Sequence, residues 1–253
     1  MKILKKQTIC CLALLLMATA IKPLQAQDST GLIKNFMLRL QAKYRNAGYL
    51  GFHIKYLYAN DGRVAAPVDS VMGEMEMHGN ECRMMLDNTE TIVTDKYTIQ
   101  VRPEEKIIIL SGTHVTGNMD PLGVIDSALA HTGGAQPRLI HQPGEDILSV
   151  TFPPGGQFTH VRIVVDARTG LLRHITYALQ TATWVTEDMI SRPDHPALYQ
   201  PEGHIDIVFS QYRHDGFNEG LFNEGNYFNK VDGRYEAAGH YKEYQIFLAS
   251  SNL

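Results

Sequence analysis

Hydrophobic and polar residues follow a helical pattern near the start of the chain and a strand pattern after it. Between about Gly31 and Ala47, apolar residues recur at helical spacing with basic residues between them, which predicts an amphipathic helix with one buried face. From Leu50 to Tyr58, apolar and aromatic residues alternate with small or polar ones. This alternation predicts a strand with a single apolar face.

Many short strands follow, each separated from the next by turn residues. The predicted strands are Ser70–Met77, Glu81–Leu86, Thr89–Thr94, Tyr97–Arg102, Lys106–Leu110, Arg138–Gln142, Asp146–Phe152, Thr159–Asp166, Leu171–Leu179, Ile205–Tyr212 and Tyr241–Ala249. Strands this close in sequence are expected to pair antiparallel, because parallel pairs need long crossovers. A second helix is predicted from Pro121 to about His131, and residues 187–203 read as irregular. The chain is therefore expected to be α+β, mainly β.

The first 26 residues have the pattern of a secretion signal. Three lysines, Lys2, Lys5 and Lys6, precede an apolar stretch from Thr8 to Ala20. A membrane anchor is the alternative, but that stretch is shorter than the roughly 20 residues that span a bilayer. With cleavage after Ala26 (or after Ala20), we expect an exported, periplasmic protein whose residues 27–253 form a single domain.

Composition and charge narrow the classes of partner. The chain has 23 Lys and Arg against 27 Asp and Glu, and its first 26 residues hold four Lys and no acid. The mature part therefore carries 19 basic and 27 acidic residues, a net charge of −8. This balance argues against nucleic acid and anionic lipid surfaces as partners. Cys82 is the single cysteine after the signal, so no internal disulfide is expected, and the residue fits a buried strand position.

Candidate catalytic chemistry is sparse. No nucleophile elbow, phosphate-binding loop or dinucleotide fingerprint occurs, and none of the eleven histidines has zinc-site spacing. The nearest set, His195 and His204 with Asp194 and Glu202, is better explained as scattered surface residues. We therefore expect no metal, no cofactor and no enzymatic activity, with a hydrolase using histidine and carboxylates as an alternative.

A short repeat and a group of methionines are the features that remain. Phe217–Gly220 and Phe222–Gly225 are two Phe-Asn-Glu-Gly units, read as tight turns that tuck aromatic rings against the sheet rather than as calcium ligands.

Five methionines occupy two adjacent predicted strands: Met72, Met75, Met77, Met84 and Met85. They suit either core filling or an adaptable apolar surface. Two helices cannot cover the apolar face of so many strands, which favours an exposed binding surface.

Several segments resemble the periplasmic outer-membrane lipoprotein carrier (LolA-like) family. The resemblance covers about Thr30 to Gln180 and is sharpest at Glu90–Val101, which is similar to that family's "ilvsDGktlwvy" hairpin. The first helix with Tyr49–Ala59, the segment Gly73–Met77, and the later hairpin Gly156–Leu179 also match. These motifs are hairpin patterns and contain no catalytic signature.

The resemblance implies a curved, unclosed antiparallel half-barrel with a few helices on its concave face. Between sheet and helices the family has an apolar cavity for lipid acyl chains or a lipidated protein, so these, and envelope proteins, are the expected partners of a monomeric carrier or sensor. The corresponding cavity residues here are Leu50, Phe52, Ile54, Tyr56, Met75, Met77, Ile99, Val101, Ile107, Ile109, Val161, Ile163 and Val165.

Two departures from the family pattern affect the functional prediction. The family has a basic residue and a proline at the turn after the second strand, with an arginine linked to cargo release, whereas this chain has His78-Gly79-Asn80. The segment from about Thr186 to Leu253 is longer than the family core and unlike it. A second hypothesis therefore remains: a structural component of an envelope assembly, in which the tail aromatics between Phe217 and Phe228 fill the groove.

Overall fold

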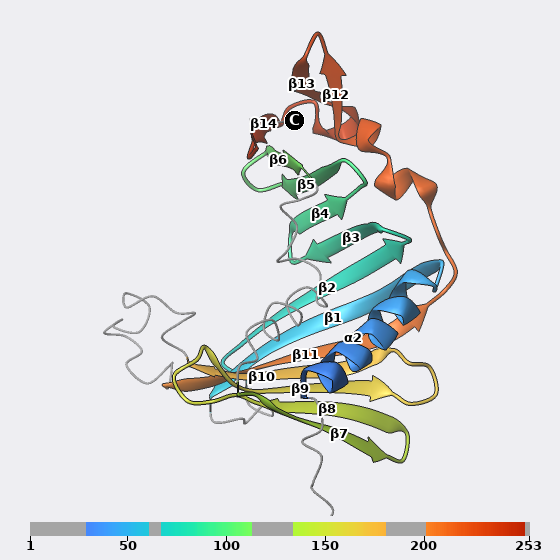
Figure 1. Ribbon diagram of the computed structural model, residues 1–253. Coiled ribbons are helices and arrows are strands. Elements are labelled where there is room, and N and C mark those ends of the chain that lie inside the picture. Colours follow the sequence, from blue (N-terminus) through green and yellow to red (C-terminus); the bar gives the residue numbers. More distant parts are fainter. Residues whose placement is uncertain (1–28, 61–66, 113–133, 181–200, 251–253) are drawn as a thin grey trace, which may run out of the picture.

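A long curved sheet with one helix on its concave side dominates the computed structural model, which describes residues 29–60, 67–112, 134–180 and 201–250 (Figure 1). The strands are β1 (Tyr49–Asn60), β2 (Asp69–His78), β3 (Glu81–Leu86), β4 (Thr89–Val93), β5 (Tyr97–Arg102), β6 (Ile107–Gly112), β7 (Gln136–Gln142), β8 (Glu145–Thr151), β9 (Phe158–Asp166), β10 (Leu172–Gln180), β11 (Glu202–Arg213), β12 (Phe228–Val231), β13 (Arg234–Ala237) and β14 (Gln245–Leu248). The main sheet has the order β14-β6-β5-β4-β3-β2-β1-β11-β10-β9-β8-β7, and β12 pairs only with β13. Its two ends do not meet, so the predicted unclosed half-barrel is confirmed.

The strands predicted between residues 50 and 110, and between residues 138 and 212, all form. The tail is where prediction and structure differ. The hairpin of β12 and β13 is not predicted, and β14 pairs parallel with β6 although antiparallel pairing is expected. Parallel pairing is open to β14 because more than a hundred residues separate it from β6, ample for a crossover. Residues 1–26, the predicted helix at 121–131 and most of the segment 187–203 lie outside the described residues.

The helix α2 (Ser29–Arg45) forms where the apolar periodicity predicts it. Its buried residues are Ile33, Phe36, Met37, Leu40 and Tyr44. Their spacing of three and four residues places them on one side of the helix. Lys43 and Arg45 lie in its last turn, where positive charge is favourable. Gly48 then adopts a φ of +67°, a conformation that suits glycine and allows the sharp turn into β1.

The register between strands divides the side chains between two faces of the sheet. Residues directly opposite each other in an antiparallel pair point to the same face, and neighbours along a strand point to opposite faces. We call the face against which α2 packs the inner face and the other the outer face. Figure 1 shows α2 lying across β8–β11 and β1, whereas β3–β6 rise beyond it.

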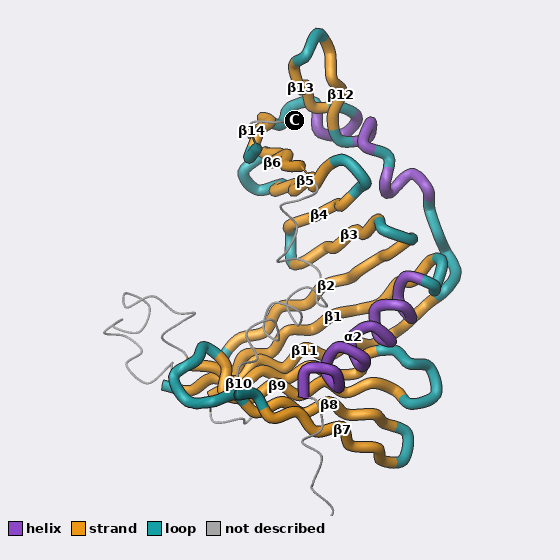
Figure 2. The backbone as a smooth tube through the Cα atoms, in the orientation of Figure 1, coloured by secondary structure: helices purple, strands orange, loops and turns teal. Residues whose placement is uncertain are grey.

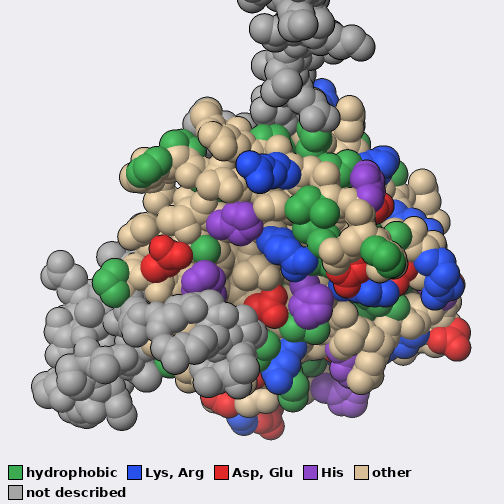
Figure 3. Space-filling model, turned by 90° about the horizontal axis from the view of Figure 1, so that it is seen from below, with side chains coloured by type: hydrophobic (Ala, Val, Ile, Leu, Met, Phe, Trp, Pro, Cys, Tyr) green, Lys and Arg blue, Asp and Glu red, His purple; other side chains and the backbone are tan. Residues whose placement is uncertain are grey.

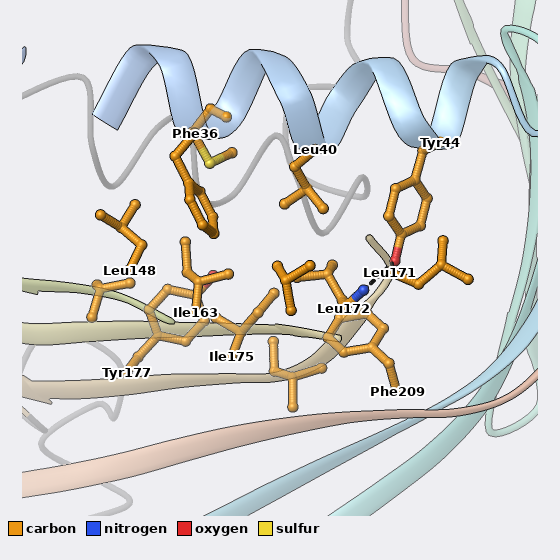
Figure 4. Close-up of a cluster of buried hydrophobic side chains, with 14 of the residues drawn as sticks. Phe36, Leu40, Tyr44, Leu148, Ile163, Leu171, Leu172, Ile175, Tyr177 and Phe209 are labelled. Atoms are coloured by element: carbon orange, nitrogen blue, oxygen red, sulfur yellow. Dashed lines mark hydrogen bonds between the residues drawn. The ribbon is translucent and has the colours of Figure 1, made fainter. Parts of the chain in front are cut away.

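Under α2 the inner face forms a close-packed core. Figure 4 shows Phe36, Leu40 and Tyr44 pointing from the helix onto side chains of β8, β9 and β10. Leu148 and Ile163 are fully buried there. Tyr44 also accepts a hydrogen bond from the backbone N–H of Leu172, at 3.2 Å. The helix is therefore held by apolar contact along its length and by a polar contact near its C-terminal end.

The C-terminal tail covers the outer face of β4, β5 and β6. Phe222, Tyr227 and Phe228 form a second buried cluster with five strand residues that are fully buried. These strand residues are Ile92, Ile99, Val101, Ile108 and Leu110. We call this set of eight residues the outer cluster. In Figure 2 the short helical turns of the tail rise to the right of β3–β5, with the β12–β13 hairpin at the top of the view.

The two Phe-Asn-Glu-Gly units are turns, as the sequence predicts. They form the 3-10 helices η3 (Glu219–Phe222) and η4 (Glu224–Asn226). Asn218 and Asn223 each accept, through Oδ1, a hydrogen bond at 3.0 Å from the backbone N–H of the glycine two residues later. The phenylalanines of the two units, Phe217 and Phe222, stack on each other with 6.2 Å between the ring centroids. The repeat therefore fixes the course of the tail over the sheet.

Candidate ligand-binding face

Beyond α2, the inner face continues as rows of directly opposed side chains from β1 to β6. One row contains Leu50, Met77, Cys82, Val93, Thr98 and Ser111, and the next contains Phe52, Met75, Met84, Thr91, Gln100 and Ile109. The parallel pairing of β14 places Phe247 beside Ile109 at the far edge. Both rows are apolar on β1–β3. The first row stays apolar at Val93 and becomes polar at Thr98 and Ser111. The second row is polar at Thr91 and Gln100 and apolar again at Ile109 and Phe247.

Several apolar side chains of this region are only partly buried, in contrast to the core under α2. We call them the inner strip: Tyr56, Met77, Cys82, Leu86, Ile107, Ile109 and Phe247. Phe247 is 50% exposed, and the others are half-buried. Four of them, Tyr56, Met77, Ile107 and Ile109, belong to the predicted cavity. Cys82, Leu86 and Phe247 are not among the predicted cavity residues, and for Phe247 only the pairing of β14 with β6 reveals the face.

Seven other predicted cavity residues lie on the expected face but inside the packed core: Leu50, Phe52, Ile54, Met75, Val161, Ile163 and Val165. All are buried, and the aromatic ring of Phe52 lies 5.1–6.0 Å from those of Tyr44, Phe209 and Tyr212. These residues support α2, and within the described residues their side chains are covered by protein.

The assignment of Ile99 and Val101 to the same cavity is wrong. Val101 lies opposite Ile108, and Ile99 lies opposite Leu110, so both residues point to the outer face and belong to the outer cluster. The register also divides the methionines. Met75, Met77 and Met84 face inward, whereas Met72 and Met85 face outward.

The hypothesis that the tail aromatics fill the groove is also wrong in its geometry. Phe217 contacts Tyr49 and His78, with ring centroids 5.4 and 4.2 Å apart, and both partners lie on the outer face. Phe222 and Phe228 are buried in the outer cluster. The tail from Phe217 onward therefore covers the face opposite to the inner strip, and within the described residues it places Gln245 and Phe247 of β14 beside inner-face residues of β6.

Two hollows adjoin this face in the described part of the chain. A pocket of about 200 Å³ lies between α2 and the sheet, where Phe36, Leu40 and Val165 meet the basic residues Arg39 and Lys43. A polar cleft of about 590 Å³ lies at the turns after β3 and β5 and includes Gln100 and Arg102. Polar groups thus border the inner strip at its β3–β6 turn end.

An ion-pair network on the outer face joins the tail to the sheet. Arg83 donates to Glu76 Oε2 at 2.9 Å and to Glu90 Oε1 at 2.5 Å. The tail contributes Tyr241, which donates to Glu90 Oε2 at 3.1 Å. Glu76 and Glu90 are 6% and 7% exposed. Two nearly buried carboxylates therefore share one guanidinium.

Arg213, the last residue of β11, lies opposite Gly51 of β1 and extends this network. It contacts Glu74 Oε1 at 2.6 Å and Glu76 Oε1 at 3.1 Å. Its side chain crosses β1 over Gly51, where a Cβ would lie 2.7 Å from Arg213 Nε. A glycine at position 51 therefore leaves room for the arginine.

Acid should destabilise the fold through Glu76. Burial alone would raise the pKa of this carboxyl, but hydrogen bonds from Tyr49, Arg83 and Arg213 outweigh it and hold the pKa below its ordinary value. A lowered pKa in the folded state stabilises the protein above the unfolded-state pKa of about 4.3, and this contribution is lost as the pH falls through the folded-state value. We expect the urea midpoint to fall below about pH 4, and to fall less in Glu76→Gln. Equal pH profiles for the two proteins would contradict this role.

Neither His160 nor His204 forms a Ser-His-carboxylate arrangement in the described part of the chain. Ser149 Oγ lies 3.4 Å from His160 Nε2, but the other ring nitrogen of His160 faces Thr151 at 3.5 Å and not a carboxylate. His204 Nε2 lies 3.7 Å from Glu202 Oε1, and His195 lies outside the described residues. Within the described ranges, no group of three or more His, Cys, Asp or Glu side chains is placed to hold a metal ion. Figure 3 shows histidines scattered among basic, acidic and hydrophobic side chains on the visible face.

Comparison with known proteins shows similarity at the level of the fold. No protein-family model matches the sequence, and no curated protein matches it. An uncharacterized conserved protein from Thermus thermophilus is similar over 85% of this chain and 98% of its own, with 8% identity and a TM-score of 0.46. A LolA superfamily protein from Nitrosomonas europaea is similar over 75% and 96%, with 12% identity and a TM-score of 0.35. A chain of the Pseudomonas aeruginosa MucA/MucB complex is similar over 76% of this chain and 60% of its own, with 14% identity and a TM-score of 0.39. Among the described helices, none has the length and hydropathy to cross a membrane.

Proposed function

We propose that this protein is a non-catalytic, exported carrier or sensor that binds lipid acyl chains, free or attached to a protein. The inner strip is the single observation that carries the proposal. Its apolar side chains lie on the concave side of the sheet and are half-buried or exposed, next to a fully packed core. Partly exposed apolar surface in a concave position is typical of ligand-binding sites.

The side chains of the inner strip suit a flexible hydrocarbon ligand. Met77 and the neighbouring Met84 have unbranched, polarisable thioethers that adapt to irregular contacts. A buried acyl chain gains about 0.8 kcal/mol per methylene group, so modest coverage of a chain gives useful affinity. The polar cleft with Arg102 and Gln100 adjoins the strip, which leaves a head group in contact with water and polar side chains.

Organic extraction of the purified mature protein tests the proposal directly. We expect mass spectrometry of the extract to detect acyl lipid in a fixed ratio to protein. The purified protein should also take up a soluble lysolipid, measured by calorimetry. Absence of both co-purified lipid and lysolipid uptake would overturn the proposal.

A charge placed on the inner strip should abolish this uptake. Ile109 is half-buried between Gln100 and Phe247 in its row, so Ile109→Glu puts an ionised carboxylate where the hydrocarbon is expected to lie. We expect lysolipid affinity to fall at least tenfold while the circular dichroism spectrum stays unchanged, because a mismatched charge costs more than about 1.4 kcal/mol.

Ile140→Glu is the matched control for this variant. Ile140 is another strand isoleucine, 44% exposed, but it lies opposite Ile147, on the outer face of β7. Its substitution should leave uptake unchanged. Equal uptake by Ile109→Glu and Ile140→Glu would show that the inner strip is not the binding surface.

A further inference from the structure

Two buried side-chain hydroxyls in the described part of the chain lack any hydrogen-bond partner, Thr98 Oγ1 and Tyr177 Oη. Thr98 is 8% exposed and Tyr177 is 3% exposed. Buried polar groups are almost always paired, and leaving one unpaired is costly. Each orphaned hydroxyl therefore requires an explanation.

Both hydroxyls lie on the inner face. Thr98 belongs to the row that begins at Leu50. Tyr177 lies opposite Ile205, which in turn lies opposite Tyr58 on the same face as Leu50. Figure 4 shows Tyr177 between the sheet and α2, close to Ile163. The two unpaired groups thus share the concave face with the inner strip.

Two other tyrosines of the same core, Tyr44 and Tyr212, have hydrogen-bond partners where Tyr177 has none. The hydroxyls of Tyr44 and Tyr212 lie 2.8 Å apart. Tyr44 also accepts from the N–H of Leu172, and Tyr212 donates to the carbonyl oxygen of Leu172 at 2.8 Å. Two buried tyrosine hydroxyls between α2 and the sheet thus have hydrogen-bond partners within the protein.

Tyr177 lies next to a group of aromatic side chains that are only half-buried. Its ring centroid lies 5.6 Å from that of Phe158, which lies 6.3 Å from that of Phe152. Both Phe158 and Phe152 are half-buried, as is Tyr56 of the inner strip. Burial, and then the neighbouring Tyr56, raise the pKa of Tyr177, so its hydroxyl stays protonated and can donate a hydrogen bond.

We infer that the inner face recognises the carbonyl oxygen of an ester- or amide-linked acyl chain through a hydrogen bond donated by Tyr177 Oη. This inference rests on the proposed function and specifies its ligand class. An apolar site with a few placed polar groups fixes the position of a ligand. A chain without a carbonyl leaves the hydroxyl unpaired and binds more weakly.

The test compares two lysolipids of equal length, 1-palmitoyl-glycerophosphocholine and its 1-O-hexadecyl ether. They differ in the carbonyl group, so hydrophobic burial is the same for both. We expect the wild-type protein to bind the ester about tenfold more tightly, the size of effect given by one well-placed buried hydrogen bond. In Tyr177→Phe this preference should disappear while affinity for the ether is retained.

Tyr97→Phe is the matched control. It removes a tyrosine hydroxyl on the outer face, where Tyr97 Oη lies 3.4 Å from Tyr235 Oη, and it should keep the ester preference. Equal binding of ester and ether by the wild-type protein would overturn the carbonyl inference and leave the carrier proposal standing. Binding of neither lysolipid would overturn both.

An N-palmitoyl dipeptide separates the two sources of an acyl carbonyl. Tighter binding of the dipeptide than of the lysolipid ester assigns the site to a lipidated protein, and the reverse assigns it to a free lipid. In either case the preference for the acyl over the alkyl form must depend on Tyr177.

Stability gives a second readout that does not depend on ligand. Tyr177→Phe removes an unpaired buried hydroxyl and should raise the melting temperature of the lipid-free protein by about 2–4 °C. Tyr44→Phe removes a paired hydroxyl and should lower it. A clear loss of stability in Tyr177→Phe would mean that its hydroxyl is satisfied within the protein, and the inference would fail.

Discussion

Replacing Arg83 by methionine is expected to lower the free energy of unfolding by about 3–5 kcal/mol, the usual cost of removing one partner from a buried ion pair. Arg83 is the shared cation of Glu76 and Glu90, both nearly buried. Burial by itself would lower the pKa of Arg83, but the hydrogen bonds and charges of Glu90 and Glu76 raise it, so the guanidinium stays charged. Without it, Glu76 keeps Arg213 and Tyr49 as partners, whereas the nearly buried Glu90 keeps only tyrosine hydroxyls among the described contacts and lacks a counter-charge.

Urea unfolding at pH 7 measures this effect, with Arg173→Met as the control. Arg173 also contacts two carboxylates, Glu145 and Asp166, but it is 43% exposed. Exposed pairs contribute less than about 1 kcal/mol, so Arg173→Met should unfold close to the wild-type midpoint. Similar losses for the two variants would show that burial of the Arg83 network does not set its strength. Changing Glu76 and Glu90 to glutamine together with Arg83→Met should recover part of the loss.

Ending the chain after Gly216 is expected to unfold the β4–β6 part of the sheet. The tail covers five fully buried strand residues of the outer cluster. Exposing five such side chains costs roughly 8–15 kcal/mol at about 1.5–3 kcal/mol each, which equals the whole stability of a typical domain of about 5–15 kcal/mol. The truncated protein should bind a hydrophobic dye strongly and should lose protection from hydrogen exchange in β4, β5 and β6.

A shorter truncation separates the aromatic contacts of the tail from its added strand. A chain ending after Glu243 loses β14 but keeps Phe222, Tyr227 and Tyr241 over the outer cluster. It should remain folded and bind little dye, because most of the outer cluster stays covered. If the chain ending after Gly216 keeps full protection in β4–β6, then the tail does not support this part of the sheet.

These two results separate stability from binding. Arg83 and the tail both act on the outer face, whereas the inner strip and Tyr177 lie on the other side of the same sheet. Changes on one face should therefore leave the other function intact as long as the sheet folds. We therefore expect the tail, which departs from the LolA-like pattern, to contribute to stability and not to ligand binding.

Strand positions follow from the sequence because alternation is a local property. In β1, one apolar residue in two, from Leu50 to Ile54, was enough to identify both the strand and its buried face. In β6 that reasoning has no basis, because Ile107, Ile108, Ile109 and Leu110 are apolar at four successive positions. Such a run indicates a strand that is covered on both faces. It does not show which of its residues point to the inner face and which point to the outer face.

The candidate site shows the same limit. The predicted cavity residues Tyr56, Met77, Ile107 and Ile109 lie in the inner strip, but the predicted Ile99 and Val101 lie on the outer face. The face to which they point depends on pairing with β6. The residues that pack over them belong to the tail, more than a hundred residues later in the chain. Neither Phe247 nor the unpaired hydroxyl of Tyr177 has a sequence signal, because a hydrogen-bond partner is present or absent only in three dimensions.

The sequence by itself determined the amphipathic helix, the succession of short strands and the excess of apolar sheet surface over helix. Each of these depends on the 3.6- and 2-residue periods that side chains follow along a single element. The tertiary structure alone decided which face each β5 and β6 residue takes, where the tail packs, and which buried hydroxyls remain unpaired. These depend on register and on contacts between segments far apart in the chain, and the free energy of such contacts is absent from any local pattern.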